Sequence, residues 1–115
     1  MSGRLGLPRS ARLCSGGEFK RVFETRKAHS NALFRVHYAP SQQTRLGLAV
    51  SRRVSPRAVE RNRIRRQIRE SFRHWREALP VADYVVVARP EAAGAETCRL
   101  RQTLDQLWQR FSDHP

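Results

Sequence analysis

Arginine side chains that could bind phosphate are concentrated in one stretch of the sequence, residues 61–76. Placed on a helix at about 100° per residue, the apolar side chains share one face that can be buried: Ile64, Ile68, Phe72, Trp75 and Leu79. A second stripe lies about 120° further round the wheel and is polar: Asn62, Arg66, Arg69, Arg73 and Arg76. Arg65 lies between the two stripes. The pattern predicts one helix with a core-facing ridge and a cationic ridge.

The cationic ridge has two interpretations, a solvated surface and a surface that binds a polyanion. Glu70 and Glu77 follow Arg66 and Arg73 by four residues and can pair with them, but both lie toward the rim of the ridge. A row of like charges with so little acid repels itself unless a polyanion covers it. The sequence therefore favours the second interpretation.

The whole chain is strongly basic. Its 115 residues suffice for one domain with one modest core. They include 23 Lys and Arg against 10 Asp and Glu, for a formal net charge of +13, and only Lys20 and Lys27 are lysines. Arginine grips phosphate with a planar fork and stacks on bases, which favours a nucleic-acid partner, although a genome rich in G and C also raises arginine usage. Binding of this kind is sensitive to salt.

Catalytic groupings are not visible in the sequence. A metal-dependent nuclease needs clustered carboxylates, and the ten acids are scattered. A histidine-pair nuclease is not suggested by the spacing of His29, His37, His74 and His114. Cys14 and Cys98 have no metal-ligand spacing, and no glycine-rich phosphate loop or nucleophile motif occurs. We therefore expect a binding protein without catalytic side chains and without a metal site of its own.

The remaining elements are those that must position the arginine helix. Residues 1–13 are predicted to form a basic, irregular arm that orders only on a partner. A helix is expected at 16–26, with Ser15 as its N-cap and Glu18 in a capping box, and strands at 32–39 and 45–51. Ser55 and Pro56 are expected to start the long helix, which continues to about Ala78. A buried strand at 83–89, a loop at 91–95 and a helix at about 96–111 complete the chain.

This order, α-β-β-α-β-α with a βαβ unit, predicts an α+β fold in which a small mixed sheet packs with helices. The chain is expected to form a single domain, 1–115. No apolar run is long enough to cross a membrane and no signal peptide is visible, so a soluble, cytoplasmic protein is expected.

Two local features could form part of a binding site. Phe19 and Phe23 share a face of the first helix and could be core residues or a platform on which unpaired bases stack. In the strand at 45–51, every second residue is small, which leaves room for a packed helix or a ligand backbone to approach closely: Gly47, Ala49 and Ser51.

The arginine stretch resembles the signature of the bacterial ribonuclease P protein subunit. The similarity rests on RNRIRR at 61–66 and IRESFR at 68–73, and it extends to FKRVF at 19–23, RLGLAVSRR at 45–53 and DYVVVAR at 83–89. It covers about residues 8–111. The resemblance implies a sandwich like the second domain of a small-subunit ribosomal protein, with a left-handed βαβ crossover where general rules predict a right-handed one.

The resemblance also implies a function and its partners. The protein would bind a large catalytic RNA that cleaves precursor tRNA at the 5′ end of the mature sequence, using Mg²⁺ held mainly by the RNA. Residues implied to face the catalytic RNA are Arg52, Arg53, Arg61, Asn62, Arg63, Arg65, Arg66 and Arg69, and the ridge adds Arg73. Residues implied to line a cleft for the single-stranded 5′ leader are Phe19, Lys20, Phe23 and His37.

Some of these positions carry their own expectations. His37 stands where many relatives have an aromatic residue such as tyrosine, and an imidazole can still stack and hydrogen-bond. At least one of Phe19 and Phe23 is expected to line the cleft. On the wheel, Arg61 is near the apolar stripe and should reach back along the core edge, whereas Arg63, on the other side, should contact a different RNA segment.

Two other functions remain open from sequence. One is a general RNA-binding or ribosome-associated protein with no role in cleavage. The other is an autonomous basic nuclease, which the scattered acids disfavour. No membrane contact and no obligate protein partner are predicted.

Overall fold

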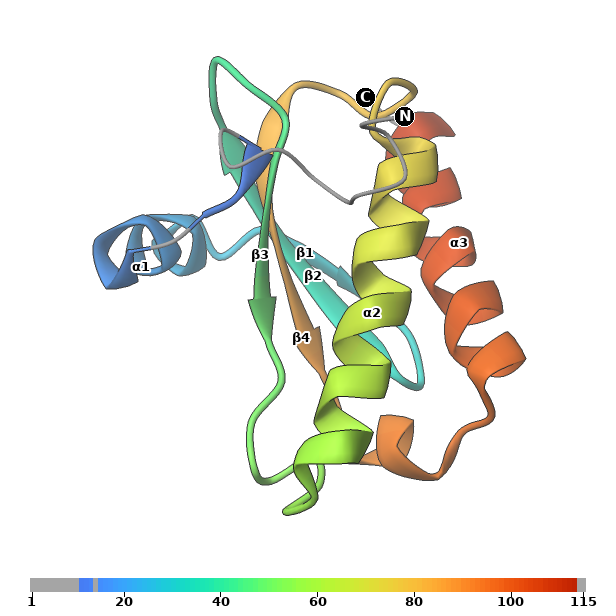
Figure 1. Cartoon of the computed structure of the whole chain (residues 1–115). Coiled ribbons are helices and arrows are strands. Elements are labelled where there is room, and N and C mark those ends of the chain that lie inside the picture. Colours follow the sequence, from blue (N-terminus) through green and yellow to red (C-terminus); the bar gives the residue numbers. More distant parts are fainter. Residues whose placement is uncertain (1–10, 14, 114–115) are drawn as a thin grey trace.

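The computed structural model describes residues 11–13 and 15–113 and has a mixed sheet with helices on both faces (Figure 1). α1 packs on one face of the sheet, and α2 and α3 pack on the other. The predicted α+β class is therefore confirmed. In chain order the elements are α1 (Gly16–Glu24), β1 (Ala28–Ser30), β2 (Phe34–Pro40), β3 (Arg45–Ala49), α2 (Ala58–Trp75), β4 (Ala82–Ala88), the 3₁₀ helix η3 (Pro90–Gly94) and α3 (Thr97–Asp113).

The four-stranded sheet has the order β1-β2-β4-β3. β3 and β4 are parallel neighbours joined through α2, whereas β2 is antiparallel to both β1 and β4. In Figure 1 both parallel strands run downward, β4 lies behind β3, and α2 returns along the right of the sheet. This path is a left-handed crossover. It places α2 beside β3, an edge strand of the sheet.

The main core lies between the sheet and the pair α2 and α3. The predicted apolar ridge of α2 faces it, since Ile64, Ile68 and Phe72 are fully buried. Trp108 of α3 meets the ring of Phe72 edge-on at 5.5 Å and the ring of Tyr84 at 5.6 Å between centroids. Edge-to-face packing of this kind fixes α2 and α3 against β4.

A smaller cluster lies under α1. Leu13, Val22, Ala39 and Val85 are buried there, and Phe19 packs against them. The predicted capping box of α1 is confirmed, because the Ser15 hydroxyl accepts from the Glu18 amide and the Glu18 carboxylate accepts from the Ser15 amide. With nine residues, α1 covers only part of this face of the sheet.

Several predicted boundaries are wrong. Ser55 does not cap α2; its hydroxyl accepts from the Arg57 amide (3.2 Å) in a turn, and the helix begins after the extended residue Arg57. Residues 91–95 were expected to be a loop, but Pro90, whose φ suits a first helical turn, starts η3. The short strand β1 was not predicted, since three residues are too few to show alternation.

The predicted basic arm also needs correction at its end. Ala11 and Leu13 are buried, and the Leu13 amide donates to the Leu46 carbonyl at 2.9 Å. Arg12 forms an isolated parallel bridge with Leu46. Residues 11–13 therefore pack along the edge of β3 without a partner molecule, and the rest of the predicted arm lies outside the described residues.

Candidate nucleic-acid interface

The outer surface of α2 and the turn before it carry arginines that have no acidic partner among the described residues. Arg66 and Arg69 are exposed on the helix, and Arg52 and Arg53 are exposed in the turn that leads into it. Within the part of the chain that the structure describes, no side chain or carbonyl accepts a hydrogen bond from these four. Asn62 is exposed on the same surface. This surface, which we call the arginine surface, offers guanidinium donors to phosphate.

Two of the arginines that the resemblance assigns to RNA lie at the inner edge of the arginine surface. Arg61 donates to the Ser55 carbonyl at 3.0 Å, so it reaches back along the core edge as its position on the wheel predicts. Arg65 donates to the Val50 carbonyl (3.2 Å) and to the Asn62 side chain (3.0 Å). Both guanidinium groups are thus directed toward the β3 side of the helix.

Arg63 lies elsewhere. Its guanidinium donates to the Glu60 carboxylate (3.1 Å), to the Ala95 carbonyl (3.0 Å) and to the Thr97 hydroxyl (3.2 Å). These contacts join α2 to the start of α3. The resemblance implies that Arg63 faces RNA, and in the protein alone its guanidinium group is held by these contacts.

Arg73 lies at the far end of the ridge. It donates to Glu70 at 2.9 Å, and this bond is the main reason why the pKa of Glu70 is lowered. Of the two arginines in reach, Glu70 therefore pairs with Arg73 and not with Arg66 among the described residues. Arg73 carries a partly neutralised charge at the rim.

A second candidate surface, the α1 cleft, lies where α1 leaves the sheet uncovered. Phe23 is 37% exposed and meets the ring of His37 edge-on at 4.7 Å between centroids. Phe19 is half-buried over Gly47, where an added Cβ would lie 2.8 Å from its Cζ. Gly47, one of the small residues at which a close approach is predicted, therefore leaves room for the ring of Phe19. Lys20 is exposed on the same helix.

The sheet extends this cleft with residues that sequence reasoning missed. His37 pairs with Val85 and Arg35 pairs with Val87 across β2 and β4, and opposite residues share a face. Ala49 pairs with Val87 from the other side. The exposed Arg35 therefore lies two residues from His37 on the cleft face, and strand alternation was the signal that could have found it.

The environment of His37 lowers its pKa. Burial disfavours the charged imidazole, and the nearby charge of Arg35 adds to the effect. Its Nδ1 atom is buried and makes no hydrogen bond with the described residues. His37 is therefore predominantly a neutral ring in the cleft at neutral pH.

A buried carboxylate holds α1 in place. Asp83, fully buried, accepts two hydrogen bonds of 2.8 Å from Arg45 and a further one from Arg21 of α1. Arg45 also donates to Glu18 of α1 at 2.8 Å. The same contacts raise the pKa of Arg45. This group, the Asp83 cluster, fixes the angle between α1 and the sheet and thereby the shape of the cleft.

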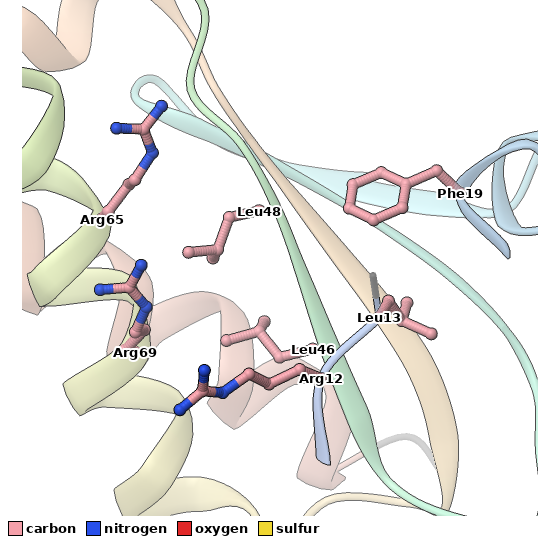
Figure 2. A pocket seen from close by; sticks show the side chains of 7 residues that line it. All are labelled: Arg12, Leu13, Phe19, Leu46, Leu48, Arg65 and Arg69. Carbon is pink, nitrogen blue, oxygen red and sulfur yellow. The ribbon is translucent and has the colours of Figure 1, made fainter. Parts of the chain in front are cut away.

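A pocket of about 240 Å³ lies at the edge of β3, between the two surfaces (Figure 2). Arg65 and Arg69 contribute from the arginine surface, and Phe19 contributes from the α1 side. The two candidate surfaces are therefore adjacent.

Metal and membrane features were also sought in the described residues. No group of three or more His, Cys, Asp or Glu side chains there could hold a metal ion. None of the helices in that part of the chain is long and apolar enough to cross a membrane.

Comparison with known proteins gives a consistent result. Residues 7–112 match the family model of ribonuclease P. The ribonuclease P protein component of Thioalkalivibrio sulfidiphilus is 40% identical over 109 residues, which span 93% of this chain and 91% of the relative. That of Xylella fastidiosa (strain Temecula1) is 44% identical over 109 residues, 94% of this chain and 81% of the relative.

Solved structures agree. The ribonuclease P protein of Staphylococcus aureus superposes with a TM-score of 0.81 at 27% identity, covering 87% of this chain and 94% of the other. The ribonuclease P protein of Thermotoga maritima superposes with a TM-score of 0.76 at 28% identity, covering 86% of this chain and 96% of the other.

Proposed function

The chain belongs to the ribonuclease P protein family, whose members are components of a tRNA-processing endoribonuclease that assembles with RNA, and we propose that it contacts RNA at two separate sites. The arginine surface binds the catalytic RNA, and the α1 cleft binds the single-stranded 5′ leader of precursor tRNA. Together they promote endonucleolytic removal of the leader. The observation that carries this proposal is the adjacency of two features: an arginine surface that meets no acidic side chain in the described part of the chain, and a cleft with an exposed aromatic ring.

The physical reason for this division is charge. The catalytic RNA and its substrate are both polyanions, so arginines held between them reduce their repulsion. An exposed ring such as Phe23 offers a stacking surface to any unpaired base. Since only the precursor carries a leader, contacts in the cleft would distinguish precursor from product and would not retain the mature tRNA.

We assign catalysis to the RNA subunit. The side chains of the two surfaces are mostly guanidinium groups and aromatic rings, with Asn62, Lys20 and His37, and a guanidinium group is always protonated and cannot act as a base. Such a positive surface does not suit Mg²⁺, which prefers carboxylate and phosphate oxygens. We therefore expect Mg²⁺ to be held mainly by the RNA, and we expect no side chain of the protein to take part in bond cleavage.

Reconstitution tests the proposal. The protein is mixed with a bacterial ribonuclease P RNA and precursor tRNA at low Mg²⁺, and release of the 5′ leader is measured. We expect the protein to stimulate release. No stimulation would leave a general RNA-binding protein, and leader release by an RNA-free preparation would identify an autonomous nuclease.

A further inference from the structure

The chain leaves α1 through a left-handed residue. Arg26 follows the C-cap residue Thr25 and has a φ of 57°, the one positive φ among the described residues other than glycine. In this conformation Cβ crowds the backbone, so glycine is the usual residue directly after a helix. An arginine here lowers stability relative to glycine. Strain of this kind marks a functional position when the surrounding structure holds the residue in place.

Contacts on both sides of Arg26 hold this conformation. Its amide donates to the Phe23 carbonyl at 3.1 Å. The Thr25 hydroxyl donates to the Tyr38 carbonyl of β2 at 2.8 Å and accepts a hydrogen bond from the Lys27 amide at 3.3 Å. The Tyr38 amide in turn donates to the Lys27 carbonyl at 3.2 Å. The end of α1 is thus tied to β2, and Arg26 is fixed in the turn that leads from α1 to β1 (Figure 1).

The guanidinium group of Arg26 takes no part in these contacts. The side chain is exposed, and none of the described residues accepts a hydrogen bond from it or forms an ion pair with it. Glu24, the nearest acid along the chain, is also exposed and forms no ion pair with a described residue. Arg21, on the same helix, differs because it binds Asp83. The donors of Arg26 are therefore available to an external anion.

The exposed ring of Phe23 indicates which anion this is. The hydrogen bond between the Arg26 amide and the Phe23 carbonyl keeps the two residues side by side at the end of the α1 cleft. Sites for single-stranded nucleic acid combine aromatic rings, on which bases stack, with cationic groups that follow the phosphate backbone. Phe23 and Arg26 supply one of each.

We propose that Arg26 binds a phosphate of the single-stranded 5′ leader, next to the nucleotide whose base stacks on Phe23. The assignment rests on the proposed function, because it takes the α1 cleft as the site of the leader. It adds to that cleft a cation from the turn after α1. Because the left-handed residue ends the helix here, Arg26 stays beside the ring instead of continuing along the helix axis.

Two substitutions of Arg26 test this contact in the reconstituted enzyme. Arg26→Gly removes the guanidinium group and relieves the backbone strain, so the variant keeps its fold. Arg26→Lys keeps a positive charge on the same backbone. Arg110→Gln, on the exposed face of α3, is the control for loss of one charge. One arm measures the Kd of the saturated holoenzyme for precursor and mature tRNA over a range of salt concentrations, and the other measures the Kd of the protein for the catalytic RNA.

We expect Arg26→Gly to weaken precursor binding about fivefold at about 0.1 M salt and to lower the slope of log K against log salt by about 0.7, the effect of one phosphate contact with a single strand. Mature tRNA and the catalytic RNA should bind as tightly as to wild type, and the urea midpoint should be no lower than that of wild type. Arg26→Lys should restore most of the affinity. Wild-type affinity of Arg26→Gly for the precursor, equal losses for precursor and mature tRNA, or a loss confined to the catalytic RNA would each overturn the assignment.

A double-mutant cycle with Phe23→Ala tests whether the two residues hold the same part of the leader. If they do, Arg26→Gly should cost less affinity when Phe23 is already replaced, because the leader has then lost its position in the cleft. Strictly additive losses would contradict neighbouring contacts. A loss with Phe23→Ala and none with Arg26→Gly would reject the Arg26 contact alone, whereas no loss with either variant would reject the proposed leader cleft itself.

Discussion

The α1 side of the sheet and the outer surface of α2 are both rich in arginine, yet their arginines end in different surroundings. On the α1 side, Arg21 and Arg45 converge on the buried carboxylate of Asp83. On α2, Arg66 and Arg69 extend into solvent with no acceptor among the described residues. An arginine that meets a carboxylate positions an element of the fold, whereas one that meets none keeps its donors for an external anion.

Arg63 shows that the distinction depends on surroundings and not on the motif. It lies within the same run as Arg65 and Arg66, but four protein groups, including Glu60 and the Ala95 carbonyl, accept its hydrogen bonds. By its contacts it belongs with the arginines of the α1 side. Substitutions in the two regions should therefore separate into losses of stability and losses of RNA binding.

The largest effect is expected for the Asp83 cluster. Asp83→Asn removes the negative charge that Arg45 and Arg21 surround, and breaking a buried ion pair should lower the free energy of unfolding by about 2–4 kcal/mol. Urea denaturation measures this change. Asp113→Asn, at the exposed end of α3, is the control and should change stability little. A stability loss no larger than the control's would show that the cluster does not hold α1.

The next effect concerns the stacking surface of the α1 cleft. Phe23→Ala should weaken binding of precursor tRNA to the holoenzyme by about 1–3 kcal/mol, the value of one base stack, and leave mature tRNA unaffected. Phe23→Trp keeps an aromatic face and should restore most of the affinity. Equal losses for precursor and mature tRNA would place the leader away from Phe23.

Arg63→Gln should act on stability. Its hydrogen bonds to Glu60, Ala95 and Thr97 are partly solvent-exposed, so we expect a loss of about 1–2 kcal/mol in the free energy of unfolding. The salt dependence of binding to the catalytic RNA should not change. A flatter salt dependence with unchanged stability would return Arg63 to the arginine surface.

Arg66→Ala should weaken RNA binding and leave stability nearly unchanged, the reverse of Arg63→Gln. Loss of one phosphate contact lowers the slope of log K against log salt by about one, with little change in stability. Filter binding to the catalytic RNA over a range of salt concentrations measures the slope, and Arg110→Ala on α3 serves as the control. If Arg66→Ala and the control share the wild-type slope, phosphate does not meet this part of α2.

The smallest effect is a pH dependence of stability through His37. Its folded-state pKa is lowered from 6.5, so the unfolded chain binds the proton more readily. The stability that neutral His37 contributes to the folded state is fully present above about pH 6.5 and is lost as the pH falls through the folded-state pKa. Urea midpoints at pH 7.5 and pH 5.5 should differ less in His37→Gln than in wild type. A His37→Gln variant with an unaltered difference would contradict this origin.

Much of the fold follows from local patterns in the sequence. The spacing of Ile64, Ile68 and Phe72 predicted the buried ridge of α2, and Ser15 with Glu18 predicted the start of α1. β1 and the true start of α2 were missed because a short strand and a turn at Ser55 depend on neighbours distant in sequence.

The candidate sites were predictable only in part. The resemblance implied that Phe23 and His37 share a cleft, and their rings do meet. It did not indicate Arg35, whose place beside them follows from the pairing of β2 with β4. Nothing local to Asp83 indicates that Arg21 and Arg45 surround it.

By itself, the sequence determined that the chain is basic, that α2 has one apolar and one cationic side, and to which family it belongs, because charge, periodicity and motif are properties of neighbouring residues. Only the tertiary structure decided which arginines remain available. The donors of a guanidinium group are taken up by whichever acceptors lie within about 3 Å of it, and for Arg45 and Arg63 those acceptors come from segments far along the chain. Arg12, Arg65 and Phe19 likewise form one pocket because the crossover through α2 and the packing of residues 11–13 bring three separate segments to the edge of β3.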